Sequence, residues 1–445
     1  MVRWPLYAVS ALSVSLYLSG PARSQVCPSP IVVNGSQCTV TPGTVVTVTP
    51  ANAIGLSATG AGGLITGNGI TTNLAAATTT GVRAQNTASI LFNGSTLATT
   101  AITTATAAGQ IGLQATGTGS SVSATGSSVT LGPANGTTVA NNLIGVSALS
   151  GGAVTLVNTN VTMLGAAGGL NNHALVSDGA GSSINVTGGT IATRSRASFG
   201  AFAQNGGSIL LDGTSIATTG VGTAAIAGGH ALFATGAGSQ VTGTNLTLGT
   251  TGNFSSPVRI ENAGAIFLTG ATITASGTSA ADTDPAAGAR VLSGGQLSLT
   301  GSTITTTGQR GTGISVQGAG STATVTDTGV SAAGNRANAL FIADGGQANV
   351  SGGTLSSAGP TSVLVQDAGS AVTLTNTAIQ GISGPALIGY GLRVNSGASA
   401  TMTGGSSTTD GRDSPGIAAS GGGSVTATNV RVTTSGNDNA MGVIA

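Results

Sequence analysis

Residues that could carry out acid–base or metal chemistry are few in this sequence. The 445 residues include eleven Asp and Glu, two His and two Cys. A glycosidase needs two carboxylates that face one bond, and a calcium-dependent lyase needs clustered acids beside a basic residue. Asp282 and Asp284 are neighbouring acids, but Pro285 follows them and the segment reads as a solvated loop. We therefore predict no catalytic residue and no cofactor.

The two histidines stand in matching sequence contexts. His173 follows two Asn and precedes Ala-Leu, and His230 follows two Gly and precedes Ala-Leu. One repeat, beginning at Gly200, lies between them, which would hold them about 10 Å apart in stacked strands. Two ring nitrogens at that separation cannot share one metal ion. We predict no metal site, and the sequence shows no P-loop, nucleophile elbow or repeated calcium nonapeptide.

The first 24 residues read as a secretory signal peptide. Arg3 precedes an apolar stretch over residues 6–18, and the small residues up to Ser24 suit cleavage after that position. Cys27 and Cys38 are the only cysteines, and they lie eleven positions apart just beyond this point. Because an exported chain reaches an oxidising compartment, these two thiols are predicted to form a disulfide.

A phrase of about nineteen residues recurs from Gly55 to the last residue. Residues 81–90 read GVRAQNTASI, residues 200–209 read GAFAQNGGSI, and residues 416–425 read GIAASGGGSV. The mean spacing is about 28 residues, which falls in the range of solenoid repeats. Within each repeat, short segments alternate apolar and polar residues and are separated by Gly-rich turns. This alternation predicts strands rather than helices.

The repeat predicts an all-β fold, a single-stranded right-handed parallel β-helix of about 14–15 coils. Residues 25–54 are expected to form an N-terminal cap and residues 55–445 the repeats, with the last coil incomplete. The handedness follows the general preference for right-handed crossovers. An antiparallel sandwich would not need one phrase to return in the same order. The formal net charge is +1 and there is no Lys, which argues against a nucleic-acid partner.

One polar position of the repeat collects large side chains. In the strand pattern small-Φ-x-Φ, where Φ is apolar, the middle residue x points opposite to its apolar neighbours, so we predict that it faces solvent. Four of the twelve Arg and three of the seven Phe occupy this position. They form the predicted contact surface: Arg83, Phe202, Phe233, Arg259, Arg290, Phe341 and Arg393. The alternative is that large side chains simply occupy the one strand with room for them, beneath a loop.

The repeat resembles the passenger region of pertactin-like and AIDA-type autotransporters. The resemblance rests on Gly-Gly-Ser turns and on strand endings such as VTGGTIAT at residues 186–193 and VSGGTLS at residues 350–356. It implies a right-handed β-helix displayed on, or released from, the surface of a Gram-negative bacterium, after passage through the periplasm. It also implies an outer-membrane translocator barrel, and no strand pattern typical of one occurs in this chain.

These observations predict an exported, surface-displayed protein that acts as an adhesin or structural display protein. Its expected partner is a protein or glycan on a host or neighbouring cell. The alternative is a β-helix enzyme that acts on polysaccharides, a lyase or hydrolase. Thr-x-Thr segments such as residues 272–274 raise the further alternative of an ice-binding face, although the ordinary β propensity of Thr explains them.

Overall fold

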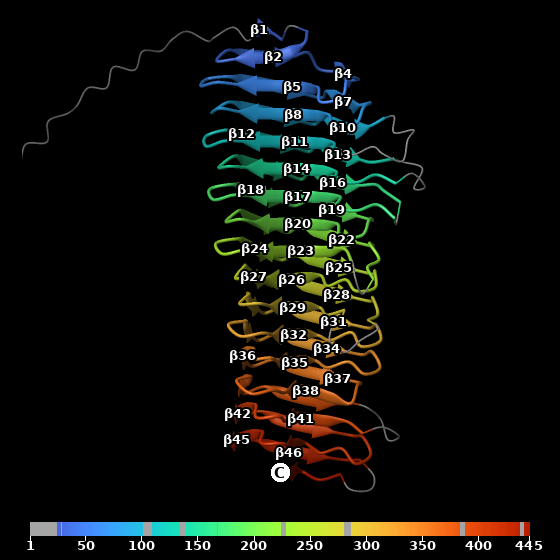
Figure 1. Ribbon diagram of the computed structural model, residues 1–445, viewed down its shortest axis with the longest axis vertical. Helices are drawn as coiled ribbons and strands as arrows, with labels where there is room; N and C mark the ends of the chain where they lie inside the picture. The colour runs from blue at the N-terminus through green and yellow to red at the C-terminus, as the bar shows by residue number, and fades with distance from the viewer. Residues whose placement is uncertain are drawn as a thin grey trace, which may run out of the picture.

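The computed structural model describes residues 25–27, 29–100, 109–133, 139–166, 168–223, 228–279, 286–382, 388–436 and 440–445. The predicted signal peptide, residues 1–24, and the acids Asp282 and Asp284 lie outside these ranges. The regular elements of the described ranges are strands, which stack into a long rod (Figure 1). A helix of the length and apolarity that a bilayer crossing requires is not found in the described ranges.

Three parallel sheets form the rod. Sheet B contains β2 (Ile31–Asn34), β5 (Ile54–Thr59), β8 (Thr80–Gln85), β11 (Ile111–Thr116), β14 (Ile144–Leu149), β17 (His173–Asp178), β20 (Phe199–Gln204), β23 (His230–Thr235), β26 (Val258–Glu261), β29 (Ala289–Leu292), β32 (Ile314–Gln317), β35 (Leu340–Ala343), β38 (Thr361–Val365), β41 (Tyr390–Val394), β44 (Ile417–Ala419) and β47 (Val443–Ile444).

Sheet A contains β1 (Gln25–Val26), β3 (Gln37–Val40), β6 (Leu64–Asn68), β9 (Ser89–Asn93), β12 (Ser121–Thr125), β15 (Ala153–Val157), β18 (Ser183–Thr187), β21 (Ser208–Asp212), β24 (Gln240–Thr244), β27 (Ala265–Thr269), β30 (Gln296–Thr300), β33 (Thr322–Thr326), β36 (Gln347–Ser351), β39 (Ala371–Thr375), β42 (Ser399–Thr403) and β45 (Ser424–Thr428).

Sheet C contains β4 (Val45–Val48), β7 (Thr71–Leu74), β10 (Thr96–Thr99), β13 (Ser128–Leu131), β16 (Asn160–Met163), β19 (Thr190–Thr193), β22 (Ser215–Thr218), β25 (Thr247–Thr250), β28 (Thr272–Ala275), β31 (Thr303–Thr306), β34 (Gly329–Ala332), β37 (Thr354–Ser357), β40 (Ala378–Gly381), β43 (Ser406–Thr409) and β46 (Arg431–Thr434).

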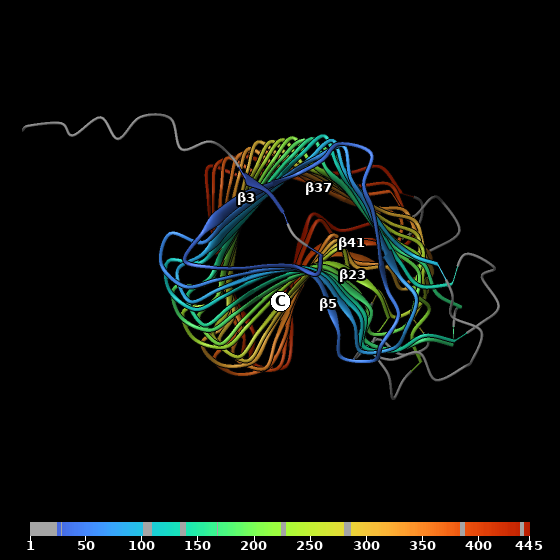
Figure 2. The same cartoon turned by 90° about the horizontal axis from the view of Figure 1, so that it is seen from above.

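Each coil of the rod contributes one strand to each sheet, in the order B, A, C. From β2 onward, a strand pairs in parallel with the strands three places before and after it in the chain. Seen from above, the strands of each sheet lie over one another and the chain winds as a right-handed helix (Figure 2). The structure therefore confirms the predicted parallel β-helix, with fifteen strands in sheet C.

Alternation along each strand builds the core. In β18 the side chains of Ile184 and Val186 are buried, whereas Asn185 between them is exposed. From β6 onward the connection from sheet A to sheet C is always two residues long. The connection from sheet C to sheet B varies from three to thirteen residues, so it absorbs the uneven spacing of the sequence repeat. Strand register is thereby preserved along the whole rod.

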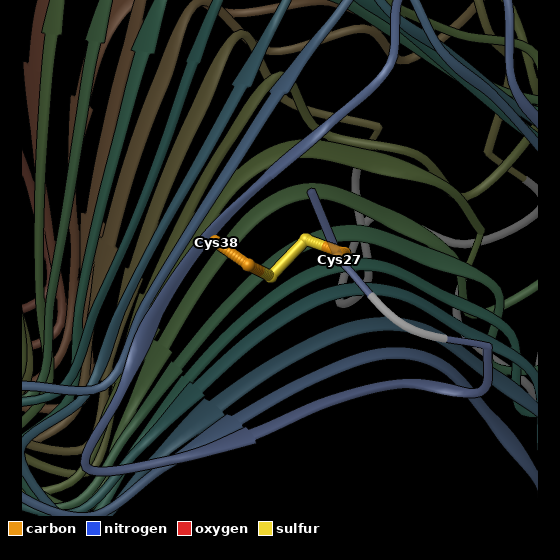
Figure 3. Close-up of a disulfide and its surroundings, with 2 residues drawn as sticks. All are labelled: Cys27 and Cys38. Atoms are coloured by element: carbon orange, nitrogen blue, oxygen red, sulfur yellow. A yellow bond between two sulfur atoms is a disulfide. The ribbon is translucent and has the colours of Figure 1, made fainter. Parts of the chain in front are cut away.

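The segment predicted as an N-terminal cap, residues 25–54, contains the strands of the first coil. β2, β3 and β4 pair in parallel with β5, β6 and β7 of the second coil. The short strand β1 lies on the outer edge of β3, and Cys27 and Cys38 form a disulfide there (Figure 3). The disulfide fastens the segment that contains β1 to β3 of sheet A.

Removing this disulfide is expected to loosen the first coil alone. Closing a loop of about eleven residues stabilises a fold by roughly 3 kcal/mol, and in a solenoid that stabilisation acts on the coil concerned and its neighbour. In a double variant, Cys27→Ser with Cys38→Ser, backbone amides of β1 and β3 should exchange with deuterium much faster, whereas those of β20 should not change. Unchanged exchange in β1 and β3 would contradict this expectation.

A column of glycines follows the strands of sheet C. Gly252, Gly277, Gly308 and Gly334 each stand two residues beyond the end of a sheet C strand. A Cβ atom on Gly277, Gly308 or Gly334 would overlap the carbonyl oxygen of the glycine one coil earlier. Consecutive coils can therefore approach this closely only because these residues lack a side chain.

Candidate functional site

The fifteen side chains of the predicted row lie in one continuous column on the outer face of sheet B. Register places each residue beside its counterpart in the next coil, including Phe202 beside Phe233 and Arg259 beside Arg290. The column runs through Ser57, Arg83, Gln114, Ser147, Val176, Phe202, Phe233, Arg259, Arg290, Ser315, Phe341, Leu364, Arg393, Ala418 and Ile444. The predicted stacking is confirmed.

The prediction that this column faces open solvent is wrong. All fifteen side chains are buried or half-buried. Phe233 is 7% exposed and Arg290 is 8% exposed. Phe233 is covered because side chains one strand apart stack on one another and because further rings lie beside the column. Phe233 nevertheless lies outside the main hydrophobic core of the rod.

Two successive inward-facing residues in β20 (Phe199–Gln204) explain the additional rings. Gly200 and Ala201 both face the core: a Cβ on Gly200 would overlap Ile216, and Ala201 belongs to the core. Two successive inward residues interrupt the alternation, so Phe199 and Phe202 on either side of them lie together, with ring centroids 5.1 Å apart. The period-two alternation of the strand does not predict that Phe199 lies on the outer face. The sequence signal for it is the small residue, here Gly200, that recurs before the first apolar position of the repeat.

Five rings form a cluster on three consecutive strands, β17, β20 and β23. Phe199 stacks between the two histidines, with centroid distances of 4.7 Å to His173 and 5.3 Å to His230. Phe202 and Phe233 stack beside them at 5.0 Å with nearly parallel planes. We call His173, Phe199, Phe202, His230 and Phe233 the ring cluster. Its geometry holds the two histidines apart with a phenyl ring between them.

Burial controls the protonation of both histidines. It lowers the pKa of His173 to about 4, and it lowers the pKa of His230 well below its usual value, with Arg259 and Arg290 contributing further. The backbone N–H of Ser256 donates a hydrogen bond to Nδ1 of His230 at 3.1 Å. Both rings are therefore neutral at pH 7. In the described part of the chain, no three His, Cys, Asp or Glu side chains gather as metal ligands.

Stability is expected to fall as the solution is acidified below about pH 6.5. The unfolded chain protonates these histidines near pH 6.5, whereas in the folded chain the pKa of His173 is lowered to about 4 and the pKa of His230 lies well below its usual value. Their contribution is thus fully present above pH 6.5, and that of His173 is lost toward pH 4. The free energy of unfolding, measured by urea denaturation, should be lower at pH 4.5 than at pH 7.5 by on the order of 2 kcal/mol.

The matched control for this pH dependence is the variant His173→Phe, which keeps a ring in the stack but removes one titrating group. Its loss of stability between the two pH values should be smaller than that of the unaltered chain. An equal loss would show that other groups cause the acid sensitivity.

The arginines of the column are held in defined positions. The guanidinium of Arg83 donates to Oε1 of Gln114 at 2.6 Å. Arg259 forms an ion pair with Glu261 at 3.0 Å, and its guanidinium lies 5.8 Å from the ring centroid of Phe233. Burial and the neighbouring Arg259 lower the pKa of Arg290 to about 10, so it remains charged at pH 7. The column therefore presents fixed cations beside aromatic rings.

The lower part of the column opens into a pocket. Phe341, Leu364 and Arg393 line a cavity of about 400 Å³ that crosses β32, β35, β38 and β41. The guanidinium of Arg393 also lies 4.9 Å from the ring centroid of Tyr390. Gln317, the last residue of β32, and Gln366, the residue after β38, line the same pocket, and the repeat pattern gave no signal for them. We call this cavity the sheet B pocket.

Charge is unevenly distributed among the three sheets. In the described strands, Asp212 is the one charged residue of sheet A, and Arg431 is the one charged residue of sheet C. The strands of sheet B carry Arg83, Asp178, Arg259, Glu261, Arg290 and Arg393. Sheet B therefore carries six of the eight charged residues of the described strands.

Comparisons with known proteins support the architecture. No protein-family model matches the chain, and no curated protein sequence is significantly similar to it. Its fold is similar to that of a chain in the cryo-EM structure of the Vag8–C1 inhibitor complex, with a TM-score of 0.56 and 17% sequence identity. The match covers 93% of this chain and 100% of the other. At that identity, the likeness concerns the fold alone, a parallel β-helix.

Proposed function

We propose that this protein is an exported, surface-displayed β-helix passenger that acts by binding, with the outer face of sheet B as its contact surface. The observation that carries the proposal is the continuous column on the outer face of sheet B, in which seven of the fifteen side chains are Arg or Phe. Aromatic and Arg side chains in partly desolvated positions contribute strongly to binding interfaces. The other two sheets offer mostly small, uncharged side chains.

Two further observations support export and a partner on another cell. The disulfide between Cys27 and Cys38 suits an oxidising compartment. Vag8, which has a similar fold, is an autotransporter passenger and was solved in complex with C1 inhibitor, a host protein. By analogy, the partner of this chain is a protein or glycan on the surface of a host or neighbouring cell, and the chain acts as an adhesin.

We also propose that the protein is not an enzyme. On the outer face of sheet B, the carboxylate of Glu261 forms an ion pair with Arg259. This pairing gives Glu261 a structural role. Asp178 accepts hydrogen bonds from Gln204 and Asn205, so it has a structural role at a turn. Incubation of the full chain with acidic polysaccharides, with and without calcium, should give no cleavage products. Product formation would favour a polysaccharide-acting enzyme instead.

Binding of the fluorescently labelled full chain to epithelial and Gram-negative cells tests the contact surface. A triple variant, Phe202→Ser, Phe341→Ser and Arg393→Gln, should bind at least about tenfold more weakly, because it removes aromatic and charged contacts. Phe233 is left in place because it is buried. Circular dichroism and thermal melting establish that the variant folds.

The matched control changes three residues on sheet A: Leu210→Ser, Asp212→Asn and Phe267→Ser. Leu210 and Phe267 are 48% and 37% exposed, so their loss should leave both fold and binding unchanged. An equal loss of binding in both triple variants, or no loss in the first, would contradict the proposed surface.

A further inference from the structure

The sheet B pocket combines three kinds of side chain. Phe341 and Leu364 supply apolar surface from the column itself. Gln317, Gln366 and Asn338 supply amide groups at its two ends. Arg393 and Arg336 supply positive charge. Asp344 is the one acid of the lining, and it is exposed. The pocket is therefore amphipathic, with an excess of positive charge.

Each component matches one feature of a sugar acid. A planar guanidinium binds a carboxylate through two parallel hydrogen bonds. Amide side chains both donate and accept, as sugar hydroxyls require of their partners. An aromatic face packs against the C–H groups of a sugar ring. A cavity of about 400 Å³ lies within the usual range for small-ligand sites, with room for one or two sugar rings.

An acidic side chain of a protein fits the pocket less well. The carboxylate of Asp or Glu would pair with Arg393, but its one or two methylene groups would leave most of the cavity unfilled. Gln317, which is 9% exposed, would then lack a ligand partner at the far end of the pocket. Groups placed to hydrogen-bond a ligand discriminate strongly against ligands that leave them unpaired.

We infer that the sheet B pocket binds a carboxylate-bearing sugar residue, such as a hexuronic acid or a sialic acid, within an acidic glycan. Arg393 binds the carboxylate, Phe341 packs against the ring, and Gln317 and Gln366 bind hydroxyl groups. This inference rests on the proposed function, since it names the ligand class of the same surface. It places recognition in the lower coils of the rod, away from the ring cluster.

Titration of the full chain with defined sugars tests the inference. Digalacturonic acid and N-acetylneuraminic acid are the acidic probes, and galactobiose and galactose are the neutral controls, with binding followed by calorimetry or saturation-transfer NMR. At least one acidic sugar should bind at least tenfold more tightly than its neutral counterpart. Equal binding of acidic and neutral sugars would overturn the inference, as would equally tight binding of a glutamate-rich peptide.

Variants locate the site. Arg393→Gln should weaken binding of the acidic sugar at least about tenfold, because a charge-assisted contact is lost. Gln366→Leu, which removes no charge, should weaken it severalfold. The matched control is Arg431→Gln, which lies on sheet C, outside both the column and the pocket lining, and should bind the sugar as the unaltered chain does. An equal loss in Arg431→Gln would overturn the assignment.

The outcomes separate this inference from the proposed function. If cells bind through sheet B but acidic sugars do not bind the chain, the inference fails and the contact surface stands. If acidic sugars bind but cell binding is unaffected by the triple variant, the contact surface fails and the pocket stands. Cleavage of the bound sugar would support the pocket and contradict the proposal that the protein is not an enzyme.

Discussion

The variant Phe92→Ala is expected to lose about 3–5 kcal/mol of unfolding free energy, as phenylalanine truncations in a packed core do. Phe92 points inward from β9 and is fully buried. Its partner in the preceding coil is Gly67, which has no side chain, and the corresponding residue of the next coil is Ala124. One large ring thus packs in the core between two coils that carry small residues at the same place, and its loss would open a cavity.

Phe267→Ala is the matched control for this prediction. Phe267 lies on the same sheet but points outward between Thr242 and Ser298, and it is 37% exposed. Its truncation should cost less than about 1 kcal/mol, because half-exposed apolar surface contributes little. Urea denaturation followed by circular dichroism measures both variants. Similar losses of unfolding free energy in the two variants would contradict the assignment of Phe92 to the inner face and Phe267 to the outer face of sheet A.

The variant Gly308→Ala is expected to lose about 3 kcal/mol, because overpacking against fixed atoms is strongly destabilising. The added methyl group would overlap the carbonyl oxygen of Gly277 in the preceding coil. The overlapping atom is backbone, so the clash is relieved only if two coils separate. Separation would weaken the hydrogen bonds between β28 and β31 as well.

Gly329→Ala is the control for the glycine column. Gly329 lies at the start of β34, in an outward column between Thr303 and Thr354, and a Cβ there would meet no atom within 4 Å. Its substitution should leave stability unchanged or raise it by about 0.5 kcal/mol, since alanine loses less chain entropy than glycine. A melting temperature of Gly308→Ala as high as that of Gly329→Ala would contradict the account of the column.

The stacking of the coils could be predicted from sequence because each strand repeats the same short alternation. A column of apolar residues such as Ile184, Ile209 and Val241 has one low-energy arrangement, in which each side chain packs on the one in the next coil. The uneven spacing of the repeat did not disturb this prediction. It falls in the connections that follow sheet C, where length has little effect on register.

Exposure on the outer face could not be predicted in the same way. The period-two rule places Phe233 on the outer side of its strand, which is correct, but burial depends on neighbouring columns. The inward pair Gly200 and Ala201 shifts Phe199 to the outer side as well. The lining of the sheet B pocket by Gln317 and Gln366 likewise depends on the shape of several coils together. Local sequence does not carry that information.

The most direct test of the contact surface is photo-crosslinking on cells with the full chain. Benzoylphenylalanine is introduced in place of Phe341 on sheet B, or in place of Phe267 on sheet A, and both proteins are irradiated on cells that bind the chain. We predict covalent adducts with a cell-surface component from position 341 and none from position 267. Adducts from position 267 alone, or equal adducts from both positions, would contradict the assignment of binding to sheet B.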